Sequence, residues 1–186
     1  VFDGVFLPGT KSPIEDLAWL RARGLDSWLS HQMNHGSQIV GVCGGFQMMG
    51  RAIHDPDGVE SNFGSMDGLG FLPVTTRLAR SKTTRTVTAR TPSGLSFEAY
   101  EIHMGVTSIE EDGCEPFALL EDGTRDGMRR GRAIGTYLHG AFESQGVIEE
   151  LLGHPVPDFH GGTKFQYHRL ADWFAAPVEH DVFLRE

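Results

Sequence analysis

The chain has 186 residues, which suits one domain and is too short for two full catalytic domains. Hydrophobic residues make up 39% of the sequence and charged residues 22%, so the composition excludes a disordered chain. The formal net charge of −9 disfavours binding to a phosphate backbone, and no apolar run is long enough to cross a bilayer. We therefore expect neither a nucleic-acid partner nor a membrane partner.

Cysteine usage and the start of the chain indicate where the protein works. Two cysteines, Cys43 and Cys114, are too few for a disulfide framework, and no basic segment followed by an apolar stretch marks a signal peptide. A reducing cytoplasm is therefore the simplest compartment. Because Val1 stands directly before a predicted strand, we expect residues 1–186 to be a single domain taken from a longer chain.

The first third of the sequence predicts strands and helices in alternation. Apolar runs predict two buried strands, at residues 5–7 and 39–42. Helices are predicted over residues 12–24, 27–35 and 46–53. The first of them has three start signals, because Ser12 can cap its end, Pro13 suits the first helical position and Glu15 follows. This helix should bury an apolar face made of Leu17, Trp19 and Leu20.

The remaining sequence changes to short β-like runs separated by turns such as the Asp-Gly pair at 122–123. The predicted strands cover residues 69–76, 84–91, 97–103, 117–120 and 133–138. Two more helices are predicted, over residues 147–152 and 163–175. Strands alternating with helices at the start of a chain indicate an α/β fold with a parallel sheet.

The sequence Gly-Val-Cys-Gly-Gly at residues 41–45 lies directly after a predicted strand and before a predicted helix. Cys43 thus occupies the centre of a nucleophile elbow, where the glycines leave room for a tight, strained turn. The helix N-terminus should lower the pKa of the thiol, and the Gly44 N–H can donate to an oxyanion. A buried structural cysteine is the alternative, which this context disfavours. Cys114 stands in an acidic turn and is expected to be inert.

A cysteine nucleophile needs a base, and His139 has the best context among the nine histidines. It follows the predicted strand at 133–138, so its ring should lie at the same sheet edge as Cys43 if the two strands are parallel. An ordinary loop histidine is the alternative. His103 also follows a predicted strand and is the competing candidate for the base.

Two other patterns suggest ligand sites but fall short of the known motifs. His31 and His35 have a helical spacing that can hold a metal, yet no third ligand is evident, so we expect no metal site. Residues 4–12 almost spell a phosphate-binding loop, but Thr10 interrupts the required Gly-Lys-Ser order. The loop at Gly9 is instead expected to lie beside the nucleophile, where a backbone N–H could act as a second oxyanion donor.

Four motifs in this order resemble the cobyric-acid-synthase-like glutamine amidotransferases. They are Leu-Pro-Gly-Thr-Lys at 7–11, Gly-Val-Cys-Gly-Gly-Phe-Gln-Met-Met-Gly at 41–50, Tyr-Glu-Ile-His-Met-Gly at 100–105 and Gly-Thr-Tyr-Leu-His-Gly at 135–140. The third motif favours the glutamine amidotransferase domains of cobyric acid synthases within that family. The resemblance, over about residues 5–142, implies a flavodoxin-like, mostly parallel sheet flanked by helices, with additional antiparallel strands.

The resemblance also implies roles for individual residues. Cys43 would attack the side-chain amide of glutamine, with His139 as the base and then as the acid. The implied oxyanion donors are Gly44 and Gly9, and the implied substrate-side residues are Gln47 and His103. Many such enzymes have a carboxylate two residues after the base, where this chain has Ala141. The third group is therefore open, with Glu143 as a candidate and an ordinary surface carboxylate as the alternative reading of Glu143.

Substrate and partners follow from the same resemblance. The family implies that glutamine is hydrolysed and that ammonia passes to an ATP-dependent synthetase domain of the same full-length chain. That domain would use ATP and Mg²⁺ to amidate adenosylcobyrinic acid a,c-diamide, whereas this domain would hold no cofactor. Two alternatives stay open: an amidotransferase subunit with a Mur-ligase-like partner acting on a peptidoglycan precursor, and a non-catalytic domain that docks a partner. A cysteine hydrolase acting on esters is a further alternative, which the resemblance does not support.

Overall fold

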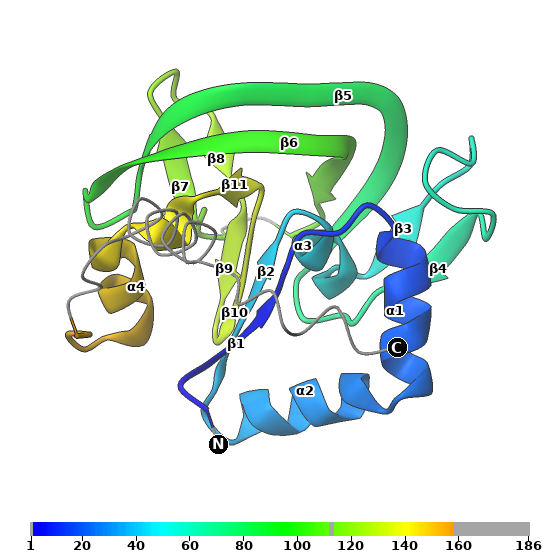
Figure 1. Ribbon diagram of the computed structural model, residues 1–186, viewed down its shortest axis with the longest axis horizontal. Helices are drawn as coiled ribbons and strands as arrows, with labels where there is room; N and C mark the ends of the chain where they lie inside the picture. The colour runs from blue at the N-terminus through cyan, green and yellow to red at the C-terminus, as the bar shows by residue number, and fades with distance from the viewer. Residues whose placement is uncertain (1, 112–113, 158–186) are drawn as a thin grey trace, which may run out of the picture.

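A four-stranded sheet, in the order β1-β2-β10-β9, carries the first motifs (Figure 1). The computed structural model describes residues 2–111 and 114–157. The strands are β1 (Gly4–Leu7), β2 (Gln38–Val42), β10 (Ala133–Thr136) and β9 (Met128–Arg130). The central strand β2 runs parallel to both β1 and β10, while β9 is antiparallel to β10. The predicted strands at 5–7 and 39–42 are thus confirmed, and the one predicted at 133–138 is confirmed as far as Thr136, because Leu138 belongs to β11 (Leu138–His139) of the second sheet. Parallel pairing explains why these strands read as continuous apolar runs.

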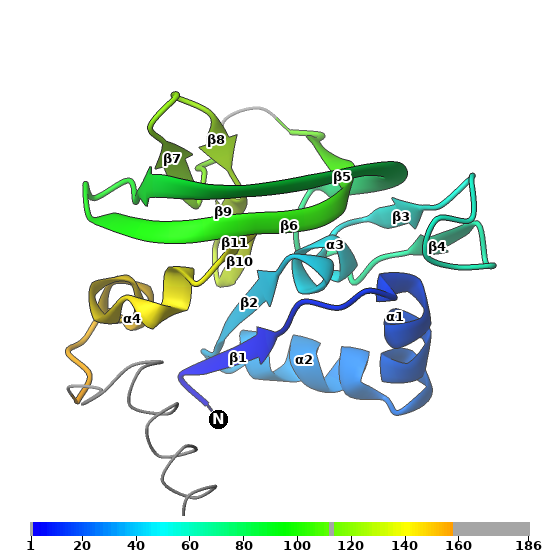
Figure 2. The same ribbon diagram turned by 45° about the horizontal axis from the view of Figure 1, so that its top comes forward.

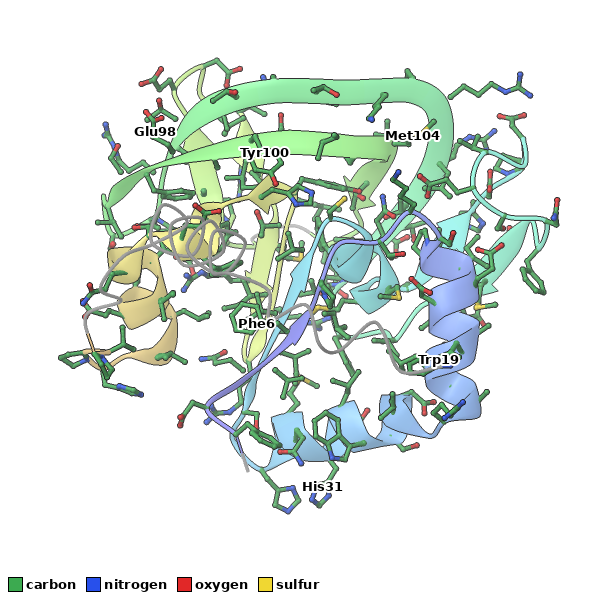
Figure 3. All side chains as sticks on the ribbon, in the orientation of Figure 1. Phe6, Trp19, His31, Glu98, Tyr100 and Met104 are labelled. Carbon is green, nitrogen blue, oxygen red and sulfur yellow. The ribbon has the colours of Figure 1, made fainter. Side chains whose placement is uncertain are left out.

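Two helices cover this sheet, α1 (Pro13–Ala22) and α2 (Leu25–Asn34), as predicted. Leu17 and Leu20 are buried, but Trp19 is 55% exposed, so its predicted place on the buried face is wrong. Figure 3 shows Trp19 on the outer side of α1, where the Arg23 guanidinium lies 5.3 Å from the centre of its ring. An α-helix turns by about 100° per residue, so Trp19, two residues after Leu17, points to the opposite side of the helix, whereas Leu20 returns to the side of Leu17.

The cap of α1 also differs from the prediction. Ser12 precedes the helix and Pro13 begins it, but the Ser12 side chain makes no capping hydrogen bond with the described backbone. Instead, the Thr10 hydroxyl accepts a hydrogen bond of 3.0 Å from the Ser12 N–H and donates one to Asp16. The residue that ties down this helix end is therefore Thr10, which also belongs to the loop after β1.

The helix predicted over residues 46–53 is shorter than expected. It is α3 (Gly44–Met49), and residues 52–54 instead form β3 (Ala52–His54). The reason is a close approach to the second sheet: a Cβ atom at Gly50 would lie 2.6 Å from the Val74 carbonyl oxygen. That oxygen accepts a hydrogen bond of 2.7 Å from the Arg51 N–H, so the chain leaves the helix to pair with the sheet.

The second sheet is larger and mainly antiparallel. Its order is β11-β6-β5-β3-β4, with β7 paired to β5 and β8 paired to β7. Only β3 and β5 run parallel. The remaining strands are β4 (Ser65–Asp67), β5 (Val74–Arg90), β6 (Ser96–Ile109), β7 (Ala118–Leu120), β8 (Arg125–Asp126) and β11 (Leu138–His139). The α/β fold class is confirmed, but the mostly parallel arrangement holds only for the smaller sheet.

Long strands β5 and β6 cross above the carboxyl ends of β1 and β2 (Figures 1 and 2). These two strands contain the predicted strands at 84–91 and 97–103. The strand predicted at 69–76 begins only at Val74, as the first part of β5. The pairing shifts register between Arg77 and Lys82, because Arg77 lies opposite Val106 and Lys82 lies opposite Met104. This irregularity adds residues to β5 alone, and β5 bends there.

The chain then forms a short 3-10 helix, η1 (Ala141–Glu143), and α4 (Gln145–Leu152), which matches the helix predicted over 147–152. The helix predicted over 163–175 lies outside the described residues. No helix in the described ranges is long and apolar enough to cross a membrane.

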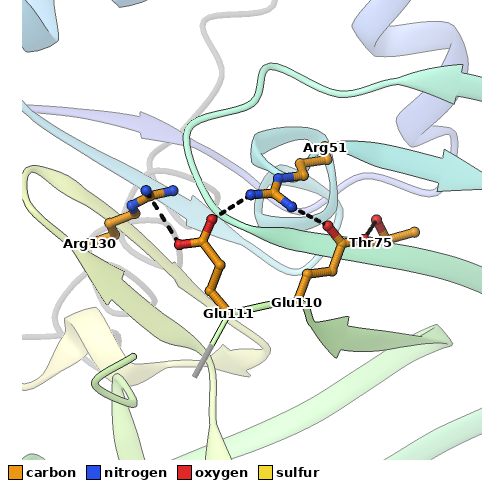
Figure 4. A network of polar contacts seen from close by, with 5 residues as sticks. All are labelled: Arg51, Thr75, Glu110, Glu111 and Arg130. Carbon is orange, nitrogen blue, oxygen red and sulfur yellow. Dashed lines mark hydrogen bonds and ion pairs between the residues drawn. The ribbon is translucent and has the colours of Figure 1, made fainter. Parts of the chain in front are cut away.

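Charged side chains tie the two sheets together at the rim (Figure 4). The Arg51 guanidinium binds Glu110 at 2.6 Å and also binds Glu111, whose other carboxylate oxygen lies 3.4 Å from Arg130 of β9. Glu110 additionally accepts a hydrogen bond from Thr75 of β5. Because these groups are largely exposed to solvent, they add little to the free energy of unfolding. Their main effect is to hold the two sheets in one relative position.

The glycines of the nucleophile turn provide the first test of this architecture. A Cβ atom at Gly45 would lie 2.0 Å from the Leu7 carbonyl oxygen, whereas one at Gly4 would meet no atom closer than 3.8 Å. We expect Gly45→Ala to lower the free energy of unfolding by about 3 kcal/mol or more, and Gly4→Ala to change it by less than about 0.5 kcal/mol. Urea denaturation measures both, and equal effects would contradict the close packing of this turn.

Asp126 provides a second test, because it is a buried carboxyl group that holds the break between β10 and β11. It accepts hydrogen bonds from the Thr136 hydroxyl and, at 3.1 Å, from the Tyr137 N–H. Burial raises its pKa to about 7, despite these hydrogen bonds. Between pH 4 and pH 7 the folded state therefore holds a proton that the unfolded chain releases, and stability contributed by Asp126 falls as the pH rises.

We expect Asp126→Asn to remove this fall, which amounts to at most about 1.4 kcal/mol per pH unit. The measurement is the difference in free energy of unfolding between wild type and variant at pH 5, 6, 7 and 8. Asp57→Asn, at an exposed position, is the matched control and should leave the wild-type slope unchanged. A slope that Asp126→Asn does not alter would contradict the burial of a protonated carboxyl group.

Candidate active site

Cys43 stands in a strained backbone conformation at the carboxyl end of β2. Its φ is 54° and its ψ is −112°, and it is the only non-glycine residue with positive φ among those that the structure describes. Its N–H donates a hydrogen bond of 2.8 Å to the Thr136 carbonyl of the neighbouring strand β10. Such strain in a residue that is not glycine is typical of a nucleophile elbow, as the sequence predicts.

Neighbouring segments leave no room for side chains around this turn. A Cβ atom at Gly44 would lie 2.5 Å from the Thr10 methyl carbon, and one at Gly41 would lie 2.6 Å from the Met49 sulfur. Thr10 belongs to the loop after β1, so this loop packs directly on the turn. The sequence prediction that the Gly9 loop lies beside the nucleophile is thereby confirmed.

The pKa of the Cys43 thiol is raised in this arrangement, whereas the sequence predicts that the helix N-terminus lowers it. Burial raises the pKa of the thiol, the Gly44 N–H lowers it, and the charge of Glu60 raises it further, with burial the largest effect. The helix N-terminus does act in the expected direction, but desolvation outweighs it. The Cys43 Sγ donates a hydrogen bond of 3.5 Å to the Ile102 carbonyl of β6.

His139 lies beside Cys43, held by the second sheet. It pairs with Tyr100 across β11 and β6, and its ring stacks on the Tyr100 ring at a centroid distance of 5.1 Å and an angle of 11°. A Cβ atom at Gly9 would lie 3.0 Å from the His139 Cε1 and 3.5 Å from the Cys43 Cβ. The backbone of Gly9 is therefore close to both side chains, as an oxyanion donor must be.

Protonation of His139 follows from its surroundings. Burial lowers the pKa of the imidazole, although a hydrogen bond with the Ile102 carbonyl raises it. The Nε2 atom is buried and has no hydrogen-bond partner within the described ranges. A neutral imidazole with a free ring nitrogen is what a general base needs to accept the proton of a thiol.

One cavity of about 690 Å³ brings the predicted residues together. Its lining includes Cys43, His139, Gly9, Gln47 and His103. Gly44, which the sequence names as the first oxyanion donor, lies directly below, with its N–H directed at the thiol sulfur. The lining also includes charged residues that the sequence analysis did not select: Lys11, Glu60 and Lys82.

Gln47 of α3 and His103 of β6 also line the cavity. The buried Gln47 amide donates hydrogen bonds of 3.2 Å to the Met104 carbonyl and to the Tyr137 hydroxyl. The His103 ring stacks on Tyr137 at 3.9 Å, and its buried Nδ1 has no partner in the described part of the chain. Burial lowers the pKa of His103, so it is also neutral. Met104 and Tyr100 lie along β6 in Figure 3.

A backbone carbonyl and an aromatic ring lie beside the predicted base. Glu143 lines a separate depression with Tyr100 and Gly140 and is absent from the described lining of the Cys43 cavity. The Ile102 carbonyl and the Tyr100 ring both contact the His139 ring. A backbone carbonyl can orient an imidazole as a carboxylate does, with less stabilisation of its charged form. The role of Glu143 stays a prediction.

The paired histidines His31 and His35 lie apart from the lining of the Cys43 cavity. The rings of His31 and His35 stack 4.0 Å apart on α2, and Figure 3 shows His31 pointing away from the sheets. No group of three His, Cys, Asp or Glu side chains in the described ranges could hold a metal ion. Cys114 is a free, partly buried thiol that packs against the core, away from the cavity lining.

Solved structures of other proteins share this fold. A crystal structure of a glutamine amidotransferase superposes with a TM-score of 0.62 at 19% identity, covering 82% of this chain and 80% of that one. The structure of PurLQS from Thermotoga maritima matches with a TM-score of 0.54 at 16% identity, covering 93% and 80% of the two chains. At these identities the likeness establishes the fold alone.

Sequence comparison adds the family. The chain is 40% identical over 183 residues to the cobyric acid synthase of Paracoccus denitrificans, covering 96% of this chain and 38% of that protein. It is 43% identical over 151 residues to the cobyric acid synthase of Rhizobium rhizogenes, covering 80% and 31%. This chain thus spans only about a third of the length of these relatives. Residues 1–147 match the CobB/CobQ-like glutamine amidotransferase domain, and the chain belongs to that family.

Proposed function

We propose that this chain is the glutamine-hydrolysing domain of a cobyric acid synthase. One observation carries the proposal: the strained Cys43 shares a cavity with His139, Gly9 and Gln47. Acyl transfer from an amide requires a nucleophile such as a thiol, a general base such as a neutral imidazole with a free nitrogen, and backbone N–H groups that stabilise the oxyanion. The family and the identity of 40–43% to cobyric acid synthases support the same activity.

The first step forms a thioester. Glutamine binds with its side-chain amide between Cys43 and the loop at Gly9, and the thiol proton moves to His139 Nε2 as sulfur attacks the amide carbon. Negative charge then develops on the amide oxygen, where the N–H groups of Gly44 and Gly9 stabilise it. His139 returns the proton to the amide nitrogen, the carbon–nitrogen bond breaks and ammonia leaves.

The second step regenerates the thiol. A water molecule gives a proton to His139 as its oxygen attacks the thioester carbon, and the carbon–sulfur bond breaks with the proton passing to sulfur. Glutamate is released. His139 accepts a proton in each half-reaction, and burial, which lowers its pKa, favours the neutral imidazole that can do so.

Ammonia would pass to an ATP-dependent synthetase part of the full-length protein. We assign ATP and Mg²⁺ to that part and the carboxylates of adenosylcobyrinic acid a,c-diamide as acceptors, since both relatives are cobyric acid synthases of greater length. No comparison supports a Mur-ligase-like partner. The retained site argues against a domain that only docks a partner. Free Cys43 and Cys114 thiols are compatible with a reducing cytoplasm.

The proposal predicts a specific loss in Cys43→Ser of the full-length protein. Glutamine-dependent amidation of the diamide should fall at least about 1000-fold, while amidation from added ammonium should be unchanged, because only the ammonia source is removed. Product formation by mass spectrometry measures both. Loss of both activities would show damage to the synthetase part, and retention of both would exclude Cys43 as the nucleophile.

Covalent labelling supplies the control. 6-Diazo-5-oxo-L-norleucine should add once to wild type at Cys43, glutamine should protect against the addition, and Cys43→Ser should not react. Equal labelling of Cys114 would contradict a formed glutamine pocket. A labelled protein that transfers no ammonia to the diamide would favour another acceptor.

The resting protonation state gives a further prediction. The rate of Cys43 alkylation by iodoacetamide should keep rising with pH through pH 9, because burial and the Glu60 charge raise the thiol pKa above its ordinary value. Peptide mapping by mass spectrometry follows the rate at this position. Glu60→Gln should move the rise to lower pH, and Asp57→Asn should not. A plateau between pH 6 and pH 8 would instead reveal a preformed thiolate–imidazolium pair.

A further inference from the structure

The charged lining of the cavity is asymmetric and suits a zwitterion. Glu60 is the one acidic side chain among the described residues that line it, while Lys11 and Lys82 supply positive charge. Glutamine carries an ammonium and a carboxylate on its α-carbon, in addition to the reacting amide. A pocket that binds it must therefore contact one group of each sign.

A separate residue holds the Glu60 segment in place. The buried Asp55 carboxylate accepts hydrogen bonds from the N–H groups of Val59, Glu60 and Ser61 at 2.6, 2.8 and 2.8 Å. Burial alone would raise the pKa of Asp55, but these three hydrogen bonds outweigh burial and lower it, so the clamp stays ionised. Because Asp55 fixes the loop, the Glu60 carboxylate is not needed for that task.

The Glu60 carboxylate is free to bind a ligand. In the described part of the chain it has no hydrogen-bond or ion-pair partner, and the side chain is half-buried. Burial, together with the charges of Asp55 and Glu15, raises its pKa to about 7. A half-buried carboxylate without a cation is costly, and a ligand ammonium would remove that cost.

We infer that Glu60 binds the α-ammonium of glutamine and thereby selects an α-amino acid over its deaminated analogue, with the lysines on the carboxylate side. This inference rests on the proposed glutamine site. The position of Lys82 supports it, because the register shift in β5 places Lys82 opposite Met104, on the stretch of β6 that lines the cavity. Opposite charges on two walls fix the direction in which the substrate enters.

Two alkylating probes that carry the same reactive group, a chloromethyl ketone, test the assignment of Glu60. L-2-Amino-5-chloro-4-oxopentanoate carries the α-ammonium, and 5-chloro-4-oxopentanoate lacks it. In both, the Cys43 sulfur displaces chloride. We expect Glu60→Gln to slow labelling by the amino probe about 10- to 100-fold relative to the deamino probe, the range of one charge-assisted hydrogen bond. The deamino probe itself should react no more slowly than with wild type, because removing the Glu60 charge lowers the pKa of the thiol. Intact-mass kinetics on the chain give the rate constants, and peptide mapping confirms Cys43.

The controls separate this inference from the proposed function. Asp57→Asn removes an exposed carboxylate from the same loop and should behave as wild type with both probes. Circular dichroism and thermal melting show whether Glu60→Gln is folded. Equal slowing of both probes in the folded variant would overturn the role of Glu60 and leave the glutamine site intact. If wild type reacted with neither probe at Cys43, the glutamine site itself would be refuted, and this inference with it.

Discussion

The site depends on the close packing of two backbone segments, the nucleophile turn and the loop after β1. Any side chain at Gly44 or Gly45 would overlap Thr10 or the Leu7 carbonyl oxygen. With both glycines pressed against this loop, α3 must begin directly after β2, and Cys43 is forced to a positive φ. The same contact brings the Gly9 backbone to the nucleophile. One steric constraint thus produces the strained conformation of Cys43 and places the Gly9 backbone where the proposed reaction requires a second oxyanion donor.

The second sheet supplies the imidazole beside Cys43 and the groups that hold this imidazole. It carries His139 on β11 and the stacked Tyr100 on β6, and the Ile102 carbonyl touches both the thiol and the imidazole. In an enzyme with a carboxylate beside the base, a full negative charge would favour imidazolium and so thiolate. Here a neutral carbonyl, that of Ile102, lies beside the imidazole, and burial favours the uncharged form of both the thiol and the imidazole. The resting site is consequently a neutral pair that must be activated when substrate binds.

The features that depend only on residues near in sequence could be predicted from the sequence. The elbow at residues 41–45, the parallel strands around it and the loop at Gly9 follow from glycine spacing and apolar runs. Distant contacts decided the rest. The helix from 46 ends early because Val74 pairs with Arg51, and the thiol pKa rises because β6 buries Cys43. Spacing could not separate His139 from His103, since both line the cavity and only the fold brings one beside the nucleophile. Spacing also could not single out Glu60, because its proposed role depends on Asp55 holding the loop. The sequence Asp-Pro-Asp-Gly-Val-Glu at 55–60 was the only local sign of this loop that the sequence offered.

Substrate recognition and nucleophile activation are linked through Glu60. Its charge is one of the causes that raise the pKa of the Cys43 thiol. An α-ammonium bound at Glu60 cancels that charge, so the pKa of the thiol falls when an amino acid, and not its deaminated analogue, occupies the cavity. The cavity therefore withholds a reactive thiolate until a ligand of the correct charge is present, which protects the cysteine from unproductive reactions while the site is empty.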